Sequence, residues 1–124
     1  MPWNFNNNTP IYLQIMDHIK LSVAIGEYKA GDKLLPVREL AAEAEVNPNT
    51  MQKALSELER DGLLYSQRTS GRYITDDEQK IAQMRNGLAT GHMDTFLDNM
   101  GELGYSSEAA LTELKNHIET QRKG

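Results

Sequence analysis

Apolar side chains recur at helical spacing through the first half of the chain. Between residues 10 and 26 they are separated by three or four positions, which places them on one face of an α-helix. The same spacing returns from about Pro36 to Ala44, and again from Pro48 to about Arg60. Asn47 is suited to cap the last of these helices, because its side-chain oxygen can accept from free amides. The pattern predicts three helices, with a very short link between the second and the third.

After the third helix the pattern becomes that of strands. Residues 63–66 and 72–75 are β-type runs, and residues 67–71 between them end in Gly71, which tolerates a positive φ. Three helices followed by a hairpin is the order of a winged helix-turn-helix, whose third helix can enter the DNA major groove. We expect this domain to occupy residues 1–75.

Residues 76–124 return to helical spacing. Gly101 and Gly104 bracket a predicted turn, and Ser106 or Ser107 caps a last helix. A segment of this size cannot bury two helical faces alone. The predicted fold class is therefore mainly α with a small β-hairpin, a winged helix-turn-helix followed by a two-helix dimerisation tail in residues 76–124.

The third predicted helix has two faces of different chemistry. The apolar face holds Met51, Ala54, Leu55 and Leu58, and the polar face, about 200° around the axis, holds Asn49, Gln52, Lys53 and Ser56. Asn and Gln can bond bidentately to adenine, and Lys can reach guanine or phosphate. Thr50 lies between the faces near the helix N-terminus, where its hydroxyl and nearby amides could hold a phosphate. Any amphipathic helix needs a polar outer face, so this helix alone leaves a merely solvated face equally open.

The hairpin shifts the balance towards nucleic acid. Its tip consists of Arg68, Thr69, Ser70, Gly71 and Arg72. Two arginines flank small hydroxylated residues without an acid nearby, which is suited to clamping a phosphate. Solvated hairpin arginines are common, and that interpretation stays open as well.

The net charge of −5, with a pI near 5.1, speaks against nucleic acid at first sight. Its distribution changes this picture. Residues 1–75 hold eight basic and nine acidic side chains, whereas residues 76–124 hold five and nine. Residues 46–56 and 62–75, which include the polar helix face and the hairpin, contain no acid. The acidity is concentrated in the tail.

These residues together resemble the GntR family of bacterial transcription regulators, and more closely its short YtrA-type subfamily. The resemblance runs in register over about half of the chain, and the combination of its pieces is specific. The pieces are Pro10-Ile-Tyr-Leu-Gln-Ile, Gly31-Asp-Lys-Leu, Val37-Arg-Glu-Leu-Ala, Val46-Asn-Pro-Asn-Thr, Ala54-Leu-Ser-Glu-Leu-Glu, Gly62-Leu and Arg68-Thr-Ser-Gly-Arg-Tyr-Ile.

The resemblance implies a homodimer, held by the tail helices, that binds a pseudo-palindromic double-stranded DNA operator as a repressor. It also implies target genes that often lie near transporter genes. Residue by residue, it points to Arg38 on the second helix, to Thr50 and its neighbours on the third, and to Gly71 with Arg72 in the hairpin.

Other function classes find little support in the sequence. The chain has no cysteine and three scattered histidines, and it has no glycine-rich phosphate loop, so we expect no enzyme, no metal site and no cofactor. The N-terminus lacks the basic and apolar regions of a signal peptide, and no stretch is long enough to span a bilayer, so we expect a cytoplasmic protein without membrane contact. Whether a small-molecule effector controls it is not readable from the sequence. The alternative function is a winged-helix protein-interaction module that never touches DNA, for which the acidic pI is the best argument.

Overall fold

The computed structural model describes residues 2–123 and divides into two compact units, of which the first ends at Arg85 and the second begins at Asn86. Three helices are followed by a hairpin and two further helices, so the predicted order of elements is confirmed. The elements are α1 (Ile11–Ala24), α2 (Val37–Ala44), α3 (Pro48–Arg60), β1 (Leu64–Gln67), β2 (Gly71–Ile74), α4 (Glu78–Glu102) and α5 (Ser107–Lys123).

Local chemistry sets the end of α2 and the start of α3. The backbone N–H of Asn49 donates to the Asn47 side chain at 2.8 Å, and Pro48 occupies the first position of α3, where a missing N–H costs nothing. Between α2 and α3, Glu45 adopts a left-handed conformation with φ 57°, which turns the chain within a few residues. The link between the two helices is therefore as short as the sequence pattern predicts.

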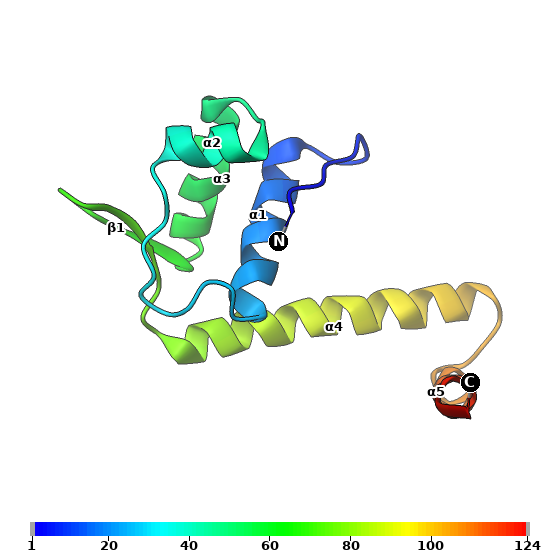
Figure 1. Ribbon diagram of the computed structural model, residues 1–124. Coiled ribbons are helices and arrows are strands. Elements are labelled where there is room, and N and C mark those ends of the chain that lie inside the picture. Colours follow the sequence, from blue (N-terminus) through cyan, green and yellow to red (C-terminus); the bar gives the residue numbers. More distant parts are fainter. Residues whose placement is uncertain (1, 124) are drawn as a thin grey trace. The chain divides into compact units, whose positions relative to one another are not determined.

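The core of the first unit is built around α3, which contacts α1, α2 and β1 (Figure 1). The largest fully buried side chains are Ile15, Ile19, Leu40, Met51, Leu55, Leu58, Leu64 and Ile74. Trp3 and Phe5 pack against this core, and the Trp3 ring stacks on His18 with centroids 3.7 Å apart. An apolar interior of this kind fixes which face of α3 remains outside.

The hairpin differs by one residue from the sequence expectation. β1 and β2 pair antiparallel from Leu64↔Ile74 to Gln67↔Gly71, so Gln67 and Gly71 form the last pair of the ladder rather than part of the turn. The loop is therefore the three residues 68–70, and Gly71 follows it with φ 116°, a conformation that other residues rarely adopt. The segment before α2 also joins this sheet through a bridge between Lys33 and Tyr73.

The first of the two helices after the hairpin, α4, is a single helix of 25 residues that belongs to both units. In its first two turns Ile81 and Met84 pack against the core of the first unit, which explains why that unit continues to Arg85. Gly101 lies inside α4 instead of before the turn, and the chain turns at Gly104 with φ 93°.

The cap of α5 is the first of the two serines expected there. The backbone N–H of Ala109 donates to the Ser106 hydroxyl at 3.1 Å, and α5 begins at the next residue. Within the second unit Ala110 is the buried hydrophobic residue, whereas Leu111, Leu114 and Ile118 stay exposed. The apolar stripe of α5 is thus present as predicted but is left largely uncovered.

Candidate nucleic-acid interface

The two faces of α3 are separated as the sequence predicts. Met51, Ala54, Leu55 and Leu58 are at most 1% exposed, whereas Asn49, Gln52, Lys53 and Ser56 all lie on the surface. Thr50 is partly exposed in the first turn. Docking of the apolar face on the core therefore turns the polar face outward, where a DNA groove could be reached.

Gln52 is held by neighbours on both sides of its amide group. Its Nε2 donates to the Ser56 hydroxyl at 3.2 Å, and its Oε1 accepts from Arg72 Nη1 at 3.3 Å. An amide in this state still has one N–H and one lone pair for a further partner. The predicted base-contacting side chain is thus oriented in advance, by its own helix and by the wing formed by β1 and β2.

Arg72 is the least exposed of the predicted contact cations, because it lies between α3 and the wing. Its Nε donates to Glu59 Oε1 at 3.2 Å, and its side chain is 18% exposed. The same carboxylate oxygen accepts from the Ser66 hydroxyl at 2.6 Å. The Ser66 hydrogen bond, together with the bond and charge of Arg72, lowers the pKa of Glu59 against an opposing effect of burial. The sequence predicts that Arg68 and Arg72 clamp a phosphate, and the structure gives Arg72 two protein partners, Glu59 and Gln52.

Lys53 is placed by an aromatic ring from another helix. Its Nζ lies 4.1 Å from the centroid of the Tyr12 ring on α1, within the range of a cation–π interaction. Gln52 and Lys53 are adjacent in sequence but are held by the wing and by α1 respectively. The exposed face of α3 is therefore contacted by the wing on one side and by α1 on the other.

The tip of the wing leaves some predicted groups more available than others. Arg68 and Thr69 are exposed, as is Gly71. The Ser70 hydroxyl donates to Gln67 Oε1 at 3.2 Å and accepts from the Tyr73 hydroxyl at 2.7 Å. A hydroxyl has one proton to donate, and the backbone N–H of Ser70 already donates to the Gln67 carbonyl oxygen at 3.3 Å. Ser70 can therefore meet a phosphate only after giving up one of its bonds to Gln67.

A hollow of about 210 Å³ separates the wing from the start of α2. Its lining includes Pro36 and Val37 at the first turn of α2, Gly71 and Arg72 of the wing, and Lys33. Arg38, the predicted α2 contact, is exposed one residue further along that helix. The hollow therefore has cationic side chains at its border and close to it.

Sequence reasoning missed three residues that shape this surface, namely Tyr12, Lys33 and Glu59. Glu59 could have been found, because it continues the helical spacing of Gln52 and Ser56 by a further three positions. Tyr12 and Lys33 left no such signal, since each meets its partner only through tertiary packing.

The fold and this surface can be compared with those of known proteins. Residues 11–74 match the model for bacterial regulatory proteins of the gntR family. The chain belongs to the GntR family. The match ends with β2, so it covers the three helices and the wing that carry the surface described above.

Similarity to other regulators extends over most of the chain, beyond the residues that the family model matches. The HTH-type transcriptional regulator YhcF of Bacillus subtilis is 36% identical over 93% of this chain and 95% of its own length. The HTH-type transcriptional repressor YtrA of the same organism is 37% identical over 88% of this chain and 79% of its own. A GntR family transcriptional regulator from Listeria monocytogenes has the same fold, with a TM-score of 0.84 and 41% identity over 90% of this chain and 98% of that one.

A solved structure that is similar to part of this chain is a complex with an operator. The DNA-binding domain of AraR in complex with operator ORX1 matches 58% of this chain and 93% of its own, with 26% identity and a TM-score of 0.54. Together with the family match, this identifies the protein as a DNA-binding transcriptional regulator of the GntR family and not an enzyme. Among the residues that the structure describes, no helix is both long and apolar enough to cross a membrane.

Proposed function

We propose that this GntR-family protein is a repressor that binds a pseudo-palindromic operator as a homodimer, with one α3 helix in each half-site. The observation that carries this proposal is the group of Asn49, Gln52, Lys53 and Ser56 on the polar face of α3, in an interval without acids, beside a wing arginine that hydrogen-bonds to Gln52. A repressor is favoured because YtrA, similar over most of this chain, is named as one. The resemblance to YtrA-type regulators makes transporter genes the first targets to test.

The proposed contacts divide between base reading and backbone binding. Asn49, Gln52 and Lys53 face outward from α3 and supply the donors and acceptors that read base edges in the major groove. Thr50, in the first turn of α3, holds a phosphate and sets the register. Further phosphate contacts come from Arg38, Arg68, Thr69, Ser70 and Arg72, with Gly71 allowing close approach of the wing backbone.

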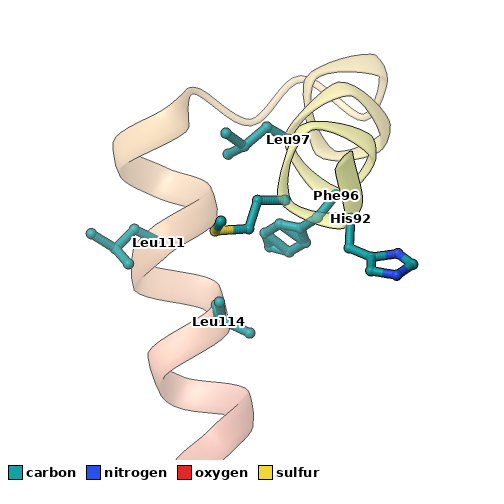
Figure 2. A pocket seen from close by; sticks show the side chains of 6 residues that line it. His92, Phe96, Leu97, Leu111 and Leu114 are labelled. Atoms are coloured by element: carbon teal, nitrogen blue, oxygen red, sulfur yellow. The ribbon is translucent and has the colours of Figure 1, made fainter. Parts of the chain in front are cut away.

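The tail supplies the proposed dimer contact. In the second unit, apolar side chains of α4 and α5 border an apolar hollow of about 330 Å³ (Figure 2). Phe96 and Leu97 of α4 and Leu111 and Leu114 of α5 are among the residues that line this hollow (Figure 2). Such a contiguous exposed apolar surface marks a contact site.

We assign this apolar surface to a second copy of the chain. Two inverted half-sites require two recognition helices, and a two-fold dimer supplies them with matching symmetry. The sequence similarity to YhcF extends over 93% of this chain and 95% of that protein, so it includes most of the tail.

Selection of bound sites from random duplex DNA with the purified protein tests the proposal. We expect enriched sequences with two inverted half-sites whose centres lie roughly 34 Å apart, or a multiple of that distance, because one helical turn separates equivalent faces of the duplex. The selected operator should be bound more weakly at higher salt, since binding releases counterions. A protein that enriches no sequence, or only asymmetric single sites, would contradict the proposal.

A further inference from the structure

Four side chains connect the recognition helix α3 to the wing. Glu59 Oε1 accepts from Ser66 Oγ of β1 at 2.6 Å and from Arg72 Nε of β2 at 3.2 Å. Arg72 Nη1 donates in turn to Gln52 Oε1 at 3.3 Å, and Gln52 lies on the same face of α3 as Glu59, about two turns nearer the start of the helix. The connection thus begins at a carboxylate and ends at the amide proposed to read a base.

This arrangement constrains the guanidinium in two directions. A guanidinium carries five N–H groups in one plane, so bonds from Nε and Nη1 to two residues of the same helix fix the orientation of that plane. Its remaining N–H groups, on Nη2 and the second position of Nη1, are left for other partners. Without Glu59, the arginine would keep only its bond to a neutral amide and would sample more rotamers.

A carboxylate at this place is unfavourable for DNA binding on electrostatic grounds alone. Glu59 is 38% exposed at the side chain and lies beside residues proposed to meet phosphates. Residues 46–56 and 62–75, on either side of it in the sequence, contain no acid. Glu57 and Asp61 lie in the same interval as Glu59, and Glu59 is the one that accepts hydrogen bonds from Ser66 and Arg72 of the wing.

We propose that Glu59 is a positioning residue for operator recognition, which fixes Arg72 against Gln52 so that the wing and α3 meet the operator as one unit. The inference rests on the proposed roles of Gln52 and Arg72 and names the residue that couples them. It also explains why Arg72 is the cation with the lowest exposure among the proposed contacts. Glu59 itself contacts no DNA in this arrangement.

Glu59→Ala distinguishes positioning from repulsion, because the two predict changes of opposite sign. If Glu59 only repels phosphates, its removal tightens binding to every duplex. If it positions Arg72, we expect affinity for the selected operator to fall about tenfold, the size of one partly exposed hydrogen bond to a charged group. Affinity for a scrambled duplex should change less, so the ratio of the two affinities falls. Titration of both duplexes by fluorescence anisotropy measures this ratio.

Two further variants control for charge and for folding. Glu57→Ala removes a carboxylate two residues away that pairs with Arg60, and we expect it to leave the affinity ratio unchanged. Glu59→Gln keeps the acceptor oxygen without the charge, and we expect it to lose only about threefold, because a neutral hydrogen bond is about half as strong. This rescue remains informative if Glu59→Ala fails to fold.

Glu59→Ala is also introduced into a chain that already carries Arg72→Ala. This double variant tests whether Glu59 acts by positioning Arg72 or only stabilises the structure through its bond to Ser66. There, Glu59→Ala should no longer weaken operator binding, because the group that Glu59 positions is gone. An equal loss in both backgrounds would overturn the inference, as would an operator-to-scrambled ratio in Glu59→Ala that matches the wild type. If the wild-type chain itself fails to distinguish the two duplexes, the proposed function fails first and the inference falls with it.

Discussion

The two compact units differ in how they treat their apolar side chains. In the first unit, α1, α2, α3 and the wing enclose a continuous set of buried residues, with eight large side chains less than 2% exposed. In the second unit, Ala110 is buried while Leu97, Leu111 and Ile118 remain exposed. The first unit buries its apolar side chains within one chain, whereas the second unit has apolar side chains at the same helical spacing but leaves most of them exposed. The difference teaches that an amphipathic pattern predicts a helix but not the molecule that covers it.

The largest expected effect comes from removing the second unit. A chain ending at Arg85 keeps Ile81 and Met84 on the first core, so we expect it to fold and to be monomeric. Its operator affinity should fall by about 10²- to 10⁴-fold, the range over which linking two binding modules raises affinity. Light scattering gives the mass, and titration with the selected operator gives the affinity. A truncated chain that stays dimeric would contradict the prediction that the second unit supplies the dimer contact.

Truncating one leucine in each unit should lower the free energy of unfolding by very different amounts. Leu58→Ala in the first unit should lower the free energy of unfolding by about 2 to 5 kcal/mol, because the side chain is fully buried and leaves a cavity. Leu111→Ala in the second unit, where the side chain is 54% exposed, should change the monomer's unfolding far less. Urea denaturation at low protein concentration measures both. Equal losses would mean that the second unit is covered by its own chain.

Sequence discrimination should reside in the first unit, and Gln52 tests this. Gln52→Ala should cost about 1 to 3 kcal/mol on the selected operator and little on random DNA, because one base contact is lost per half-site. Thr50→Ala should weaken both, as expected for a phosphate contact. Competition titrations with the two duplexes provide the ratio. An unaltered ratio in Gln52→Ala would leave discrimination to the wing or to DNA shape.

A charge placed on each unit sharpens the contrast between them. Leu13 of α1 and Leu114 of α5 are equally exposed, at 38% each. We expect Leu114→Glu to weaken dimerisation by about tenfold or more, since a buried charge at an interface is unpaired, and Leu13→Glu to leave it unchanged. Sedimentation over a concentration series gives the dimer dissociation constant. Dissociation caused by Leu13→Glu instead would move the interface to the first unit.

The smallest expected effect concerns the pH dependence of the first unit. The pKa of Glu59 is lowered in the folded state, so its contribution to stability is complete above the ordinary glutamate pKa and is lost as the pH falls through the folded value. Glu59→Gln should therefore lose less stability than the wild type on acidification below about pH 4.5. Thermal melts from pH 6 to pH 3 compare the two. Parallel curves would show that Ser66 and Arg72 do not favour the ionised form.

The sequence was sufficient to predict most of the first unit. Helical spacing, the Asn47 cap and the proline at position 48 act within a few residues, so α3 and its buried face could be predicted from local chemistry. The exact end of the hairpin could not, because Gln67 and Gly71 can pair or turn with similar ease. Contacts of Lys53 with Tyr12 and of Arg72 with Glu59 bring distant residues together, and no periodicity encodes them. For the same reason, neither the hydrophobic pattern of the sequence nor the structure of a single chain identifies the molecule that covers the exposed apolar surface of the tail.

The pairing of Arg72 with Glu59 has a consequence for how the regulator finds its target in a genome. A partly neutralised wing, joined to a tail with nine acids against five bases, limits the attraction between this chain and DNA of arbitrary sequence. A genome presents about 10⁶ to 10⁹ competing sites, and each molecule held at one of them is lost to the operator. Weak non-specific binding keeps a larger share of the regulator molecules off other DNA sites and available for the operator. A regulator present in few copies per cell could then occupy its operator without being made in excess.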